Sequence, residues 1–107
     1  RYSGDMAEPR PGMQSGHVPG SLSAPFAEMI DAQSGLLRSK DDIRAIFAAR
    51  NVDLSRPLAC TCGSGVTACV VALALHEIGH TDAAVYDGSW SEWGGDANLP
   101  KKQGLTP

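Results

Sequence analysis

The feature that most constrains the fold is a glycine-rich loop between two apolar segments. Residues 58–61 (LACT) form an apolar run that is too short for a helix and fits a buried parallel strand. Residues 62–67 (CGSGVT) follow, and residues 68–75 (ACVVALAL) then read as a buried helix closed by Gly79. Residues 83–86 (AAVY) predict a second short strand. A strand, loop, helix and strand at this spacing predict a βαβ unit, so we expect an α/β fold with a parallel sheet.

The rest of the chain predicts one further helix and much irregular backbone. Ser39 is a candidate N-cap, and Ile43, Ile46 and Phe47 follow it at helical spacing. We therefore expect an amphipathic helix from Ser39 to about Arg50. Short helical turns are expected at residues 26–30 and 89–93, and irregular structure is expected at residues 1–25 and 94–107.

Length and charge limit the classes of partner. A chain of 107 residues is enough for one domain with one modest core. Its formal net charge of -3 argues against a nucleic-acid partner, because such proteins neutralise phosphates with basic residues. No apolar run approaches the ~20 residues of a membrane span, and residues 1–10 lack the apolar core of a secretion signal. We expect a cytoplasmic protein that contacts no membrane.

The cysteines do not suggest a disulfide framework. Cys60, Cys62 and Cys69 are an odd number and lie within ten positions of one another, so at least one thiol should be free. Cys60 and Cys69 are expected to be buried as small hydrophobic side chains. Trp90 is expected to pack against the domain, and His17 to orient its own loop.

The loop itself predicts a reactive thiol at Cys62. Successive backbone N–H groups in such a turn can point at one atom, and the helix that follows adds about half a positive charge. Both effects favour the thiolate of Cys62. Gly63 and Gly65 would permit tight, partly left-handed backbone and close approach of a substrate. A structural cysteine beside a tight turn remains the alternative.

Other classes of cysteine or loop enzyme fit the sequence poorly. A cysteine phosphatase needs an arginine that closes the loop, but Thr67 and Ala68 occupy that place. Disulfide exchange needs a Cys-x-x-Cys spacing, which is absent. A nucleotide-binding P-loop needs a lysine after its glycines, and none occurs between Lys40 and Lys101.

Three segments resemble the rhodanese family, and the loop is similar to that of its 3-mercaptopyruvate sulfurtransferase branch. They are the loop 62–67 (CGSGVT), residues 15–21 (SGHVPGS) and residues 85–93 (VYDGSWSEW), and residues 93–100 (WGGDANLP) look bacterial in style. The resemblance spans almost the whole chain. It implies a rhodanese-like parallel sheet flanked by helices, with residues 1–107 as a catalytic domain. It also implies that this chain is a fragment that lacks the first strand and a preceding rhodanese domain.

The resemblance further implies an activity and a site. Cys62 would take sulfur from 3-mercaptopyruvate as a persulfide, release pyruvate, and pass the sulfur to cyanide or to a thiol acceptor such as thioredoxin. Ser64 would complete a relay with His and Asp residues of the upstream rhodanese domain, which could be a separate chain. Arg1 and Arg10 would hold the substrate carboxylate and carbonyl. The remaining substrate-binding residues would be Gly63, Gly65, Val66 and Thr67, and no metal or organic cofactor is implied.

Two alternatives remain open. Thiosulfate:cyanide sulfurtransfer is one, although thiosulfate-using relatives usually have a basic residue after the cysteine. The other is a non-catalytic rhodanese module that binds a partner without turnover, and the presence of Cys62 argues against it.

Overall fold

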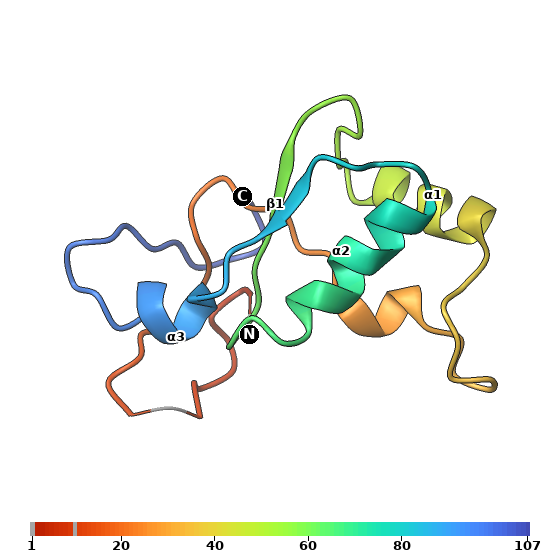
Figure 1. Cartoon of the computed structure of the whole chain (residues 1–107). Helices are drawn as coiled ribbons and strands as arrows, with labels where there is room; N and C mark the ends of the chain where they lie inside the picture. Colours follow the sequence, from red (N-terminus) through yellow and green to blue (C-terminus); the bar gives the residue numbers. More distant parts are fainter. Residues whose placement is uncertain (1, 10) are drawn as a thin grey trace.

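The computed structural model describes residues 2–9 and 11–107 (Figure 1). Its elements confirm the predicted order and, to within two residues, the predicted limits. They are the 3-10 helix η1 (Phe26–Met29), α1 (Lys40–Ala49), β1 (Leu58–Cys60), α2 (Ala68–Glu77), β2 (Ala83–Val85) and α3 (Ser89–Trp93).

The two strands form a parallel sheet, as the βαβ pattern predicts. Ala59 lies opposite Ala84 in the register. The N–H of Leu58 donates to the carbonyl of Asp82, and the N–H of Tyr86 donates to the carbonyl of Cys60. Because alternate residues of a parallel strand bond to the same neighbour, the peptide groups of Ala59 point away from β2. In the part of the chain described, no strand pairs with that outer edge of β1.

The core lies between α2, the sheet and η1. Helix α2 contacts both strands and η1, and α1 also contacts η1. Figure 1 shows the three helices together on one side of the sheet. Helix α1 buries Ile43 and Phe47, which are four positions apart and therefore share one face of the helix. Ser39 caps this helix as predicted, because its hydroxyl accepts a hydrogen bond from the N–H of Asp42 at 3.2 Å.

The N-terminal segment is irregular, but it is tied to the C-terminal tail. His17 and Lys102 exchange backbone hydrogen bonds of 2.8 and 3.0 Å. The ring of His17 stacks on Tyr2 with centroids 3.7 Å apart, and its Nδ1 lies 2.7 Å from the carbonyl oxygen of Tyr2. Trp90 is buried and donates from Nε1 to the carbonyl of Gln14 at 2.7 Å. The predicted packing of Trp90 is confirmed, and the role of His17 in orienting its own loop stays a prediction.

One predicted burial is wrong. Cys60 is buried at the end of β1, but Cys69 is exposed in the first turn of α2. Helix α2 is apolar on nearly all sides, so its sequence does not mark which face turns inward. Leu73, on the same helix, is 49% exposed. Among the described residues no helix is long and apolar enough to cross a membrane.

The core predicts a large difference between two truncations. Phe47→Ala removes a ring that is 1% exposed, and we expect the free energy of unfolding to fall by about 3–5 kcal/mol. Leu36→Ala is the control, because Leu36 is 69% exposed and its loss should change that free energy by less than about 0.5 kcal/mol. Urea denaturation of both variants measures the difference, and equal effects would contradict the assignment of the core.

Candidate functional site

The loop after β1 brings backbone donors to the thiol of Cys62. The N–H of Gly65 donates to its Sγ at 3.0 Å. Gly65 has a φ of +92°, and a Cβ at this position would lie 2.7 Å from the carbonyl oxygen of Asp87. Only glycine combines this conformation with this close approach. Gly63 is not among the glycines with positive φ, so the expectation of left-handed backbone holds for Gly65 alone.

The pKa of Cys62 reflects a balance of opposing causes. Partial burial raises the pKa, because it disfavours the charged form. Hydrogen bonds outweigh that effect and lower the pKa from the ordinary 9.0 to about 7. The donors are the hydroxyl of Thr67 and the backbone N–H groups of Ala68, Ser64 and Gly65. About half of the thiol is therefore ionised near pH 7, against a few per cent for an ordinary cysteine.

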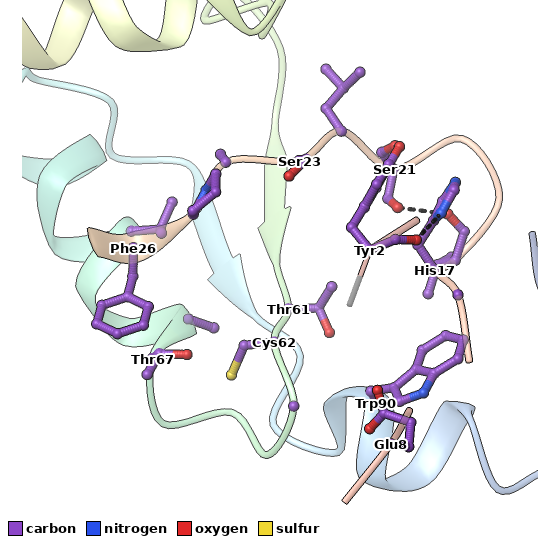
Figure 2. A pocket seen from close by; sticks show the side chains of 18 residues that line it. Tyr2, Glu8, His17, Ser21, Ser23, Phe26, Thr61, Cys62, Thr67 and Trp90 are labelled. Atoms are coloured by element: carbon purple, nitrogen blue, oxygen red, sulfur yellow. Dashed lines mark hydrogen bonds between the residues drawn. The ribbon is translucent and has the colours of Figure 1, made fainter. Parts of the chain in front are cut away.

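The hydroxyl of Thr67 binds the sulfur of Cys62 rather than capping α2. It stands at the N-cap position of α2, where a threonine hydroxyl commonly accepts from the backbone. Here the Thr67 side chain makes no capping hydrogen bond and donates to Cys62 instead. Figure 2 shows Thr67 and Cys62 close together, with Phe26 beside Thr67.

The segment that follows β2 holds the loop from the other side. The N–H of Trp90 donates to the carbonyl of Cys62 at 2.9 Å, and the N–H of Ser91 donates to the carbonyl of Gly63 at 2.8 Å. The N–H of Cys62 itself donates to the Oγ of Ser89 at 3.1 Å. Sequence reasoning missed Ser89, because its contact with the loop spans 27 positions and depends on the fold.

A cavity of about 250 Å³ opens beside the thiol (Figure 2). Cys62, Gly63 and Thr67 line it together with Thr61 and Trp90. Its lining also includes Tyr2, His17 and Phe26 from the N-terminal half of the chain. The site is thus built where the end of β1, the start of α2 and the start of α3 meet the N-terminal loop.

The predicted site residues divide into three groups. Cys62, Gly63 and Thr67 line the cavity, whereas Ser64, Gly65 and Val66 belong to the loop but do not line it. The side chain of Val66 points outward and is 72% exposed. Arg1 and Arg10 lie outside the described residues.

The other two cysteines differ from Cys62. Burial raises the pKa of Cys60, so this thiol stays protonated at neutral pH. Cys69 donates from its Sγ to the carbonyl of Gly65 at 3.4 Å. All three thiols are free. Over residues 2–9 and 11–107, no group of three or more His, Cys, Asp or Glu side chains could hold a metal ion.

Comparison with known proteins gives a consistent family. The rhodanese-like domain profile matches residues 7–96. Human 3-mercaptopyruvate sulfurtransferase is 50% identical over 93 residues, which are 87% of this chain and 31% of that protein. Rat thiosulfate sulfurtransferase is 50% identical over 94 residues, again 87% of this chain and 31% of that protein.

Solved structures agree. The sulfur transferase subunit of yeast mitochondrial complex I is 43% identical, with a TM-score of 0.80, over 99% of this chain and 34% of that one. The chain spans 31% and 35% of the length of the curated 3-mercaptopyruvate sulfurtransferases of human and Escherichia coli, and 26% of the mitochondrial thiosulfate/3-mercaptopyruvate sulfurtransferase 1 of Arabidopsis thaliana. On these matches the chain belongs to the rhodanese-like domain family.

Proposed function

We propose that this domain transfers sulfur from 3-mercaptopyruvate through a persulfide on Cys62. The observation that carries the proposal is the set of donors around Sγ, with the N–H of Gly65 at 3.0 Å and a pKa of about 7. A thiolate that is half formed at neutral pH, beside a cavity of about 250 Å³, is a nucleophile with room for a small substrate.

The proposed reaction has two steps. The thiolate of Cys62 attacks the sulfur of 3-mercaptopyruvate, a sulfur–sulfur bond forms, and the carbon–sulfur bond breaks. Its electron pair leaves with the carbon as the pyruvate enolate, which then takes up a proton. The N–H groups of Ser64, Gly65 and Ala68 stabilise the negative charge on Sγ before the attack and after sulfur is passed on. In the second step an acceptor thiolate or cyanide attacks the outer sulfur and restores the Cys62 thiolate.

Other parts of the proposal rest on the family resemblance. Arg10 and Arg1 would bind the carboxylate and carbonyl of the substrate, and Ser64 would help deliver the proton to the enolate. Ser64 is an exposed residue, so other groups would have to orient its hydroxyl and pass the proton on to it. We propose that an upstream rhodanese domain supplies them, and that a thioredoxin-like thiol is the acceptor.

A second donor, thiosulfate, is favoured by one finding. The chain is as similar to rat thiosulfate sulfurtransferase as to human 3-mercaptopyruvate sulfurtransferase, at 50% identity each. Against it stands the loop 62–67 (CGSGVT), which has no basic residue after Cys62, where thiosulfate-using relatives usually have one. The ratio of kcat/KM for the two donors in the full-length protein decides between them. A higher value for thiosulfate would reject the mercaptopyruvate assignment.

The assignment of Cys62 predicts a specific covalent product. After incubation with 3-mercaptopyruvate and no acceptor, the protein should gain about 32 Da, the mass of one sulfur atom. Cys62→Ser should abolish this gain and sulfur transfer, whereas Cys69→Ala, at an exposed thiol, should keep both. Intact-protein mass spectrometry measures the product. A gain that persists in Cys62→Ser would reject the assignment, and no gain in the unchanged protein would favour a non-catalytic binding module.

The lowered pKa predicts the pH dependence of thiol reactivity. Because the thiolate is present above a pH of about 7 and lost below it, the rate of Cys62 alkylation by iodoacetamide should rise through that pH and level off above it. Thr67→Val removes one donor to the sulfur and should move the midpoint upward by roughly one unit. Thr81→Val, at an exposed position, is the matched control. Peptide mass spectrometry follows Cys62 separately, and a midpoint that stays in place in Thr67→Val would exclude this role of Thr67.

A further inference from the structure

We propose that Ser89 is a positioning residue for the reactive thiol: its buried hydroxyl fixes the first peptide group of the loop, so that the later N–H groups converge on the sulfur of Cys62. The inference rests on the proposed function, because it gives Ser89 a part in presenting the nucleophile. It concerns a residue that lies 27 positions after Cys62 and reaches the loop only through the fold.

The hydrogen bonds of Ser89 occupy its whole hydroxyl. The Oγ donates to the carbonyl of Tyr86 at 2.8 Å. It accepts from the N–H of Cys62 at 3.1 Å and from the hydroxyl of Thr61 at 3.2 Å. A serine hydroxyl has one hydrogen to donate and two lone pairs, so no capacity remains for a substrate or for Sγ. Ser89 therefore acts on the thiol through the backbone of Cys62.

The backbone conformation of Ser89 also supports a functional role for this residue. Its φ is +48°, in the left-handed region that a side chain disfavours, and its exposed fraction is 0%. Gly88, directly before it, has an ordinary φ of -59°. The chain thus places the strained conformation on the residue with the hydroxyl, although a glycine stands next to it. Such strain persists only where the surrounding contacts determine it, which is typical of functional sites.

The contact with Ser89 orients the turn that follows Cys62. The N–H of Cys62 is directed at Ser89, and the carbonyls of Cys62 and Gly63 accept from the N–H groups of Trp90 and Ser91. Each of the three peptide units from residue 61 to residue 64 is thus held by a hydrogen bond. The next turn then carries the N–H of Gly65 to 3.0 Å from the sulfur. Without the Ser89 hydroxyl, the N–H of Cys62 would lose its partner, and the peptide would turn to find another.

Two variants of the full-length protein separate the hydroxyl from the backbone strain. Ser89→Ala removes the hydroxyl and keeps the disfavoured φ, whereas Ser89→Gly removes the hydroxyl and relieves the strain. Both should raise the midpoint of Cys62 alkylation by about one pH unit, which slows alkylation at pH 7 roughly five-fold. Both should also lower kcat for 3-mercaptopyruvate roughly ten-fold, with little change in KM, because the nucleophile rather than the substrate site is altered.

The control tests whether any lost hydrogen bond has the same effect. Ser39→Ala removes the cap of α1, more than twenty residues before the loop, so it should lower the melting temperature and leave the alkylation midpoint unchanged. An unchanged midpoint in folded Ser89→Gly, or an equal shift in Ser39→Ala, would overturn the inference. The alkylation midpoint needs no sulfur donor. A shift in Ser89→Gly without any persulfide in the unchanged protein would therefore support the role of Ser89 while rejecting the proposed function.

Discussion

The loop after β1 holds one sulfur atom, that of Cys62, as an anion in a partly buried place. Burial alone would push the pKa of Cys62 upward, so the charge exists only because aligned donors offset that effect. The parallel strand β1 ends just before the thiol, and α2 begins at Ala68, whose N–H is one of the donors. The remaining secondary structure supports this junction. Helix α2 packs on both strands and on η1, and α1 contacts η1.

The elements that could be predicted from the sequence are those with local signals. Ser39 with apolar residues at helical spacing predicted α1, and the structure has this helix at Lys40–Ala49. The apolar runs on either side of the loop predicted β1, α2 and β2, because strand length and helix length are visible in a single window. The convergence of donors on Cys62 could also be expected, since a strand, a turn and a helix already determine where the N–H groups of the turn point.

What sequence reasoning missed depends on tertiary contacts. Ser89 follows β2 and reaches the N–H of Cys62 at the same end of the sheet, and nothing in its local sequence shows that contact. The exposure of Cys69 was mispredicted because α2 has no clear polar face from which to derive its orientation. A threonine directly before a helix commonly caps it. Only the position of the sulfur of Cys62 shows why the hydroxyl of Thr67 makes no capping hydrogen bond.

The close approach of Gly65 to Asp87 joins two stretches of chain that are more than twenty residues apart. A side chain at Gly65 would press on the turn after β2, and that turn leads into α3, whose N–H groups at Trp90 and Ser91 hold the carbonyls of Cys62 and Gly63. The conformations of the loop and of the segment after β2 are therefore coupled. An engineer who wished to enlarge the loop for a bulkier sulfur donor would have to redesign both stretches together, because a change in either one alone would misalign the other.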